Sequence, residues 1–208
     1  PMYEELKTIC DSLAANPSIR VAIFRGAGDK AFVSGSDIQQ FVDLKKDEAY
    51  EVAVDNIFSS LQLLPMPTIA LIEGLAVGSG LLIATACDFR ISTPEARFGI
   101  PVARTLGNCL SPSNLSWISA HLGIPMVKKM LLTSELIKAP ELLASGYLYE
   151  TVAAEEITQA VDALANKLAA LAPITQKASK LTLARLLQNN LPECTDLMRE
   201  TYNSQDFK

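Results

Sequence analysis

The stretch GLAVGSGLLIATACD, residues 74–88, determines how the rest of this sequence is interpreted. The residues before it, TIALIE (68–73), are apolar on both faces, as in a strand covered on both sides of a sheet. Gly78, Ser79 and Gly80 then lead into a small-residue segment typical of a helix. Residues 74–87 contain no charged side chain. The bend thus raises the question of what an uncharged glycine-serine-glycine turn at the start of a helix does.

Around this stretch, strands and helices alternate for about 150 residues and then give way to helices only. We predict strands at 19–24, 68–73 and 88–93 and a further strand after Gly146. We predict helices at 2–16 and 47–64, one or two helices at 113–133, and only helices from 153 onward, the last beginning at about Pro192. Residues 31–37 and 94–101 are predicted to be irregular. Helical spacing puts Leu6, Ile9, Cys10 and Leu13 inward on the first helix, and Val54, Ile57, Phe58 and Leu61 inward on the second.

The composition indicates a globular protein that does not bind nucleic acid. The 208 residues are 49% hydrophobic and carry a net charge of -5, with no basic stripe. No apolar run reaches the roughly 18 residues of a membrane span, so we expect no membrane partner. The four cysteines are widely separated and no signal peptide opens the chain, which favours a cytoplasmic location. Because the chain is this apolar, we expect it to bury part of its apolar surface by self-association.

Several familiar catalytic patterns are absent or incomplete. GAGDKA (26–31) fits the start of a dinucleotide-binding turn, but the residues after it are a poor helix start, so a polar turn is favoured. His121 is the sole histidine, no G-x-S-x-G accompanies it, and one histidine with scattered cysteines cannot build a metal site. Glu155 and Glu156 resemble ordinary helix-start charges rather than a catalytic pair.

Two glycine-bearing bends remain, AFVSGSD (31–37) and AVGSGLL (76–82), and each enters a helix. The first N–H groups of a helix have no intrahelical acceptor, and glycine lets a ligand approach the backbone closely. If the two bends face each other, their N–H groups form an oxyanion hole around one oxygen atom. From the residues alone, two ordinary tight turns remain the slightly favoured interpretation.

Four stretches together resemble the crotonase (enoyl-CoA hydratase/isomerase) superfamily. They are residues 19–41, 65–93, 96–101 and 136–152. The resemblance implies an α/β fold, with a crotonase-type spiral of ββα units at 1–152 that lacks its N-terminal strands and a helical oligomerisation region at 153–208. It implies an acyl-CoA thioester as substrate, with coenzyme A as part of that substrate and no separate cofactor, and assembly as a trimer or hexamer. We expect both ends of the chain to be cut.

The resemblance places the two oxyanion N–H donors on Ser36 and Ser79. The residues expected to contact substrate are Val33, Ser34, Gly35, Asp37, Ile38, Gly78, Gly80, Leu82 and Val102. Asp37 is expected to cap a helix rather than act as a base. Serine at position 79 keeps the N–H but requires a negative φ unless the backbone is strained.

The sequence departs from the pattern at both positions where hydratases of the family carry catalytic glutamates. These positions are Leu82 and Val102, so hydration by a two-glutamate mechanism is not expected. The polar segment 103–114 replaces a glycine-rich turn. Within it, Arg104 can pair with a substrate carboxylate or form a subunit contact, and Asn108 can donate to substrate or shape the loop.

Two functions follow from this pattern. The first is an acyl-CoA enzyme that stabilises a thioester enolate, as an atypical hydratase, isomerase, decarboxylase or lyase. The second is a non-catalytic acyl-CoA binder or scaffold. The sequence does not identify the acyl group.

Overall fold

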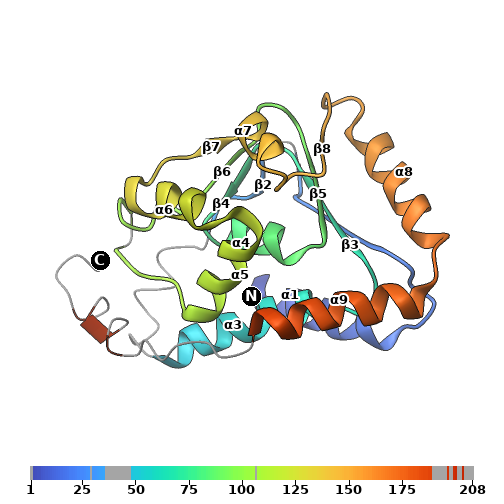
Figure 1. The fold of residues 1–208 in the computed structure, drawn as a ribbon, viewed down its shortest axis with the longest axis horizontal. Helices are drawn as coiled ribbons and strands as arrows, with labels where there is room; N and C mark the ends of the chain where they lie inside the picture. Colours follow the sequence, from blue (N-terminus) through green and yellow to red (C-terminus); the bar gives the residue numbers. More distant parts are fainter. Residues whose placement is uncertain are drawn as a thin grey trace.

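Two four-stranded sheets carry the fold in the computed structural model, which describes residues 2–28, 30–35, 48–105, 107–188, 196, 199, 200 and 203 (Figure 1). The first sheet has the order β1-β3-β5-β8 and is parallel throughout. The second has the order β2-β4-β6-β7, with only β7 antiparallel to its neighbour. The strands are β1 (Ala22–Arg25), β2 (Ala31–Val33), β3 (Thr68–Ile72), β4 (Leu75–Val77), β5 (Phe89–Ser92), β6 (Arg97–Gly99), β7 (Ile137–Lys138) and β8 (Glu150–Thr151).

From β1 to β6, consecutive strands alternate between the two sheets, and a helix follows each pair. Thus β3 and β4 are followed by α4 (Ser79–Ala86), and β5 and β6 by α5 (Pro112–Leu122). This repetition is the expected ββα arrangement. The short strands β2, β4 and β6 fall where irregular segments or a glycine-rich bend were predicted, because three residues are too few to show an alternating pattern.

The remaining helices are α1 (Met2–Ala15), α3 (Glu48–Gln62), α6 (Ile124–Thr133), α7 (Ala139–Ala144), α8 (Ile157–Ala169) and α9 (Pro173–Gln188). The predicted helical region at 113–133 is two helices, because Gly123 takes a φ of 76° between α5 and α6. In Figure 1, α8 lies beside β3 and β5, and α1, α3 and α9 lie at the bottom of the view. The helix predicted from Pro192 falls mostly outside the described residues.

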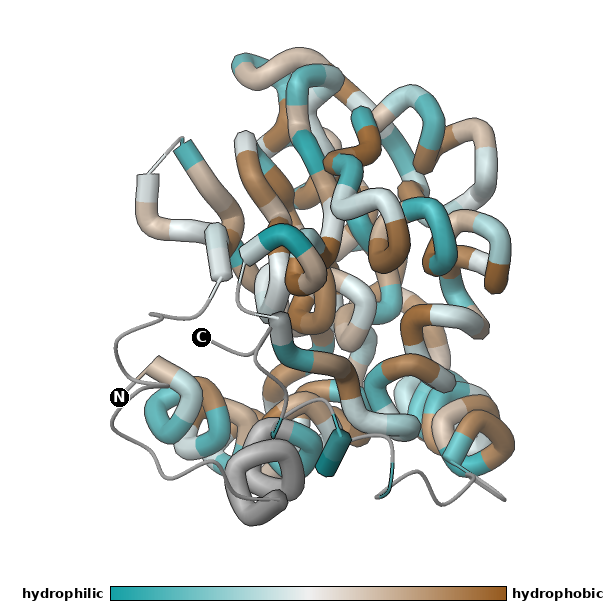
Figure 2. The backbone as a smooth tube through the Cα atoms, turned by 90° about the vertical axis from the view of Figure 1, so that its left-hand side faces the viewer, coloured by the Kyte–Doolittle hydropathy of each residue, from teal (hydrophilic) through white to brown (hydrophobic). Residues whose placement is uncertain are grey.

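Two groups of apolar side chains hold these layers together. The larger surrounds α4, whose residues 80–86 are all buried. In the smaller, β3 and β5 pack against the apolar face of α8. Every residue of β3 is buried, as expected for a strand covered on both sides. Hydrophilic and hydrophobic residues alternate along the outer helices in Figure 2, as amphipathic helices require.

The predicted inward faces are confirmed with one exception. Cys10, Ile57, Phe58 and Leu61 are buried, whereas Ile9 is 45% exposed, so its predicted inward position is wrong. The side chain of Val54 lies outside the described part of the structure. No helix in the described ranges is long and apolar enough to cross a membrane.

Candidate active site

The two glycine-bearing bends lie against each other. Gly35 and Gly78 have φ angles of 116° and 60°, which favour glycine. A Cβ built on Gly78 would lie 3.6 Å from the Cα of Gly35. At Gly80, a Cβ would lie only 2.0 Å from the backbone oxygen of Val33. The bend after β2 is therefore packed directly onto the start of α4, and position 80 has no room for a side chain.

The backbone N–H of Ser79 is the unpaired donor at this contact. The N–H before it, of Gly78, already donates to the Gly99 oxygen at 2.8 Å. Ser79 is the first residue of α4, so it has no intrahelical acceptor, and no other described group accepts its N–H. The positive end of the helix dipole adds to the attraction for a negatively charged oxygen. This N–H is available to a ligand oxygen.

The Ser79 side chain also has unused hydrogen-bonding capacity. Its Oγ is buried and has no partner among the described residues. Ser134 is the sole described non-glycine residue with positive φ, so Ser79 takes the negative φ that a serine at this position requires. Because buried hydroxyls are normally paired, the orphaned Oγ beside a free N–H is an arrangement that a bound ligand would complete.

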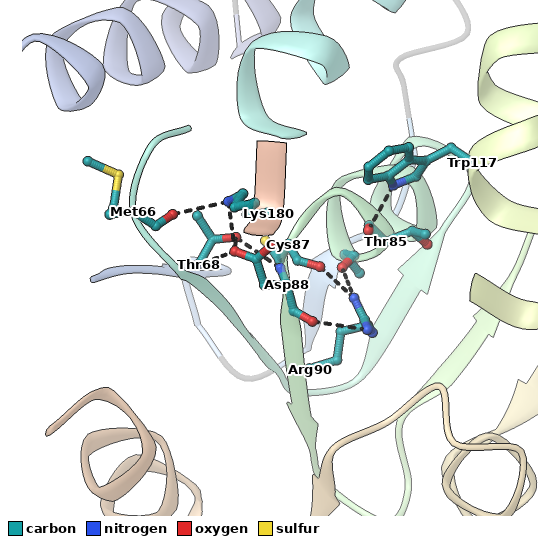
Figure 3. Close-up of polar contacts among 9 residues, drawn as sticks. Met66, Thr68, Thr85, Cys87, Asp88, Arg90, Trp117 and Lys180 are labelled. Carbon is teal, nitrogen blue, oxygen red and sulfur yellow. Dashed lines mark hydrogen bonds and ion pairs between the residues drawn. The ribbon is translucent and has the colours of Figure 1, made fainter. Parts of the chain in front are cut away.

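The opposite end of α4 is held by side chains from neighbouring elements (Figure 3). The guanidinium of Arg90 donates to the Cys87 oxygen at 2.6 Å and to the Ala84 oxygen at 3.3 Å. Trp117 on α5 donates through Nε1 to the Thr85 oxygen at 3.0 Å. A buried cation thus faces the negative end of the helix dipole, and α4 is fixed along its axis.

A half-buried carboxylate lies where α3 meets the start of α5. Asp55 accepts at Oδ1 from Ser111 Oγ and from Asn114 Nδ2, both at 2.7 Å. Ser111 also caps α5 by accepting from the Asn114 N–H. Burial raises the pKa of Asp55, and the Ser111 hydrogen bond acts in the opposite direction. No cation among the described residues pairs with this carboxylate.

The family model for enoyl-CoA hydratase/isomerase matches residues 1–207. The chain belongs to the enoyl-CoA hydratase/isomerase family of enzymes. It is 29% identical to the short-chain-enoyl-CoA hydratase of Clostridium acetobutylicum, over 99% of this chain and 80% of that protein. It is 32% identical to the (E)-benzylidenesuccinyl-CoA hydratase of Thauera aromatica, over 90% of this chain and 73% of that protein.

Solved structures agree with this assignment. An enoyl-CoA hydratase/carnithine racemase from Magnetospirillum magneticum superimposes with a TM-score of 0.85 at 31% identity, covering 98% of this chain and 77% of that one. A methylmalonyl-CoA decarboxylase superimposes with a TM-score of 0.88 at 23% identity, covering 98% and 81%, which shows a shared fold. The expected α/β crotonase fold is confirmed.

The predicted site residues fall into three groups. Val33, Ser34 and Gly35 lie on one bend and Gly78, Ser79 and Gly80 on the other, and the structure brings the two bends together. Ser36, Asp37 and Ile38 lie outside the described residues. Leu82 is buried in α4, and Val102 packs against the larger apolar core. Because both side chains are hydrocarbons, neither can exchange a proton.

In the segment 103–114, the two predicted polar residues differ in environment. Arg104 is exposed, and no described acidic group pairs with its side chain. Asn108 is half-buried, and its Oδ1 is buried without a partner among the described residues. Asn108 therefore has an unused hydrogen-bond acceptor, and it lies in the same segment as Ser111, which bonds to Asp55.

Sequence reasoning missed two charged residues that the structure makes important. Arg90 lies in the middle of the predicted strand at 88–93, where a charged residue among apolar ones was a detectable signal. Asp55 lies between Val54 and Ile57, which the helical spacing predicts to face inward, so a charged side chain next to the apolar face was also detectable in the sequence. His121, by contrast, is a packed residue as favoured above, since its Nδ1 lies 2.8 Å from the Trp117 oxygen and burial lowers its pKa.

Proposed function

We propose that this enzyme binds an acyl-CoA thioester and stabilises its enolate with the N–H groups of Ser79 and Ser36. The observation that carries the proposal is the contact between the two bends, with the Ser79 N–H unpaired beside it. Ser36 lies outside the described residues and is proposed from the resemblance, which places it directly after Gly35 in the chain. Removing one such donor typically lowers kcat by about 10²–10³-fold.

The side chains around the bends support a reaction other than two-glutamate hydration. Leu82 and Val102 supply no acid or base, and each such group typically contributes about 10²–10⁴-fold. An atypical hydratase, an isomerase, a decarboxylase and a lyase all use the same enolate. We propose Arg104 and Asn108 as contacts to polar groups of the acyl chain, because the first is exposed without an ion pair and the second has an unpaired oxygen.

The test compares Ser79→Pro with Ser79→Ala on a panel of CoA thioesters. Proline removes the N–H, yet the first position of a helix tolerates it, so the variant should fold. Alanine keeps the N–H and removes only the orphaned hydroxyl. We expect Ser79→Pro to lose about 10²–10³-fold in kcat while Ser79→Ala stays active. A folded Ser79→Pro enzyme with unchanged turnover would remove this N–H from the mechanism.

The non-catalytic alternative makes a different prediction in the same experiment. A binder or scaffold would bind crotonyl-, malonyl- and 3-hydroxyacyl-CoA and convert none of them. Binding without turnover across that panel would favour it. The family assignment and the intact glycine contact favour the enzyme.

We also propose that residues 153–208 form a C-terminal region that assembles a trimer or hexamer, with 1–152 as the spiral core. The supporting observation is apolar exposure on α9, where Ile174, Leu183 and Leu186 are 82%, 63% and 63% exposed. Light scattering of the purified protein tests the assembly, and a monomer would refute it. A cytoplasmic location stays a prediction, since the relatives include bacterial and mitochondrial proteins.

A further inference from the structure

We propose that this protein has a second binding site, separate from the glycine bends, which takes a neutral phenol with an apolar substituent. The site is a cavity of about 450 Å³ at the C-terminal end of α4. Its walls come from the ends of α3, α4 and α8 and from one face each of α5 and α9. Small-molecule sites in proteins have volumes of about 300–1,000 Å³, so the cavity is large enough for such a ligand.

The cavity lies at the opposite end of α4 from the proposed oxyanion donor. Ala86, the last residue of α4, lines the cavity, whereas Ser79 is the first residue of that helix. Seven residue steps along the helix separate the two by about 10 Å. None of the described residues that are predicted to contact the thioester lines the cavity. A ligand bound here therefore does not compete for those residues.

The cavity walls are mostly hydrocarbon and aromatic. They include Ala86, Phe89, Trp117, Leu168, Ala184 and Leu187. The rings of Trp117 and His121, which also lines the cavity, lie beside each other with their centroids 4.9 Å apart and their planes at 38°. Aromatic side chains make stacked and edge-to-face contacts with a ligand ring, and the leucines suit an apolar substituent.

The charged groups at the cavity neutralise each other (Figure 3). Lys180 Nζ lies 2.7 Å from Asp88 Oδ2 and also donates to the Met66 oxygen. The same carboxylate oxygen accepts from the N–H and the Oγ1 of Thr68 at 2.8 and 2.9 Å. Both charges thus have protein partners, and a charged ligand would find no counter-ion of its own among the described lining residues. A neutral ligand is favoured, because burying an unpaired charge is costly.

The amide of Gln62 points to a ligand with a hydroxyl group. Gln62 lines the cavity and is only 5% exposed, yet no described group forms a hydrogen bond with its side chain. Buried side-chain amides are normally paired, since an unpaired amide has lost its bonds to water without replacement. The amide offers both donors and an acceptor, and a hydroxyl can accept from the former or donate to the latter.

The imidazole of His121 offers a second acceptor to the cavity. Its Nδ1 lies 2.8 Å from the Trp117 carbonyl oxygen, which can only accept, so Nδ1 carries the proton. Burial lowers the pKa of His121, so the ring is neutral at about pH 7.5 and Nε2 keeps its lone pair. No described group donates to Nε2. A phenol fits this set of groups, because it brings a strong O–H donor on an aromatic ring.

Three related ligands test the site by calorimetry and by the fluorescence of Trp117. This residue is the single tryptophan and lines the cavity. 4-Propylphenol has the ring, the apolar substituent and the hydroxyl, 4-propylanisole has lost the O–H donor, and 4-propylbenzoate carries a charge. We expect saturable binding of the phenol with a change in Trp117 fluorescence. The anisole should bind about 3–10-fold more weakly, and the benzoate more than about 10-fold more weakly.

Two variants assign the hydrogen bonds to their residues. His121→Phe keeps an aromatic ring and removes Nε2, and Gln62→Met keeps the length of the side chain and removes the amide. Each should weaken binding of the phenol by about 3–10-fold and leave binding of the anisole unchanged where its acceptor is not used. Gln62→Met deletes an unpaired buried amide, so it should fold at least as stably as the wild type, and it keeps the test available if His121→Phe does not fold. Gln159→Met, on the exposed side of α8 and away from the cavity, is the matched control and should bind as the wild type does.

Several outcomes would overturn the inference. They are the absence of binding, equal affinity for the phenol and the anisole, and unchanged phenol affinity in both variants. Displacement of the phenol by crotonyl-CoA would place it in the thioester site instead. Affinity that falls as the protein concentration rises would assign the cavity to a second copy of the chain. Thioester turnover is a separate measurement, so a failure of the enolate function and a failure of this site are distinguishable.

Discussion

Substituting Gly80 by alanine is the most direct way to test whether the two bends must touch. The new Cβ would lie 2.0 Å from the Val33 oxygen, 2.9 Å from the Val33 carbonyl carbon and 3.0 Å from its Cβ. Real Cβ atoms do not approach closer than 3.0 Å, so the bend after β2 and α4 must separate by about 1 Å. The nearest atom is backbone, and it cannot rotate away.

The expected loss of stability combines two opposing contributions. Overpacking of this kind costs about 1–3 kcal/mol, and alanine returns about 1 kcal/mol through its higher helix propensity. The net loss of stability is up to about 2 kcal/mol, which corresponds to a fall of up to about 8 °C in Tm for a chain of this size. The loss of activity should be larger, because a displacement of about 1 Å in a catalytic group can cost about 10²-fold.

Gly146→Ala provides the matched control. Gly146 has a φ of 80° and no atom within 4 Å of a built Cβ, so alanine there strains the backbone without crowding anything. The strain costs about 1–2 kcal/mol, similar to the loss expected at Gly80. Thermal unfolding and thioester turnover are measured for both variants. We expect both to lose stability and only Gly80→Ala to lose activity. Equal turnover in the two would refute the reasoning that the bend contact forms the site.

Two further predictions concern α9 and α5. Lys180→Met removes the 2.7 Å ion pair with Asp88 and the hydrogen bond to the Met66 oxygen (Figure 3). Both contacts are largely shielded from solvent, so the variant should lose about 1.5–3 kcal/mol of stability. Urea unfolding followed by Trp117 fluorescence measures this loss, and an unchanged midpoint would contradict the prediction. Burial lowers the pKa of His121 below its ordinary 6.5, so the unfolded state gains its proton first, and stability should fall as pH drops from about 7.5 toward 5.5. In His121→Gln, Tm should depend less on pH across this interval than in the wild type. Identical dependence of Tm on pH in the two proteins would refute a lowered pKa for His121.

Most of the helices and strands were predictable because patterns of neighbouring residues in the sequence determine them. The apolar residues of β3, the proline and glycine breaks and the helical spacing in α3 all act over a few residues. The strands β2, β4 and β6 were missed, since each is three residues long and pairs with a strand distant in sequence. Ile9 followed the apolar spacing of α1 yet lies on the outside, because spacing alone does not specify how wide a face the neighbours cover.

The sequence by itself determined the family, the positions of Gly35, Gly78 and Gly80, and the loss of carboxylates at Leu82 and Val102, because each is a property of residue type and order. Only the tertiary structure decided which backbone N–H is free and which side chains bind the Asp55 carboxylate. The Gly78 N–H is consumed by Gly99 while that of Ser79 is not, and Asp55 meets Ser111 and Asn114 across 56 and 59 positions of sequence. Such pairings depend on how helices align in space, and local patterns along the chain do not encode that alignment.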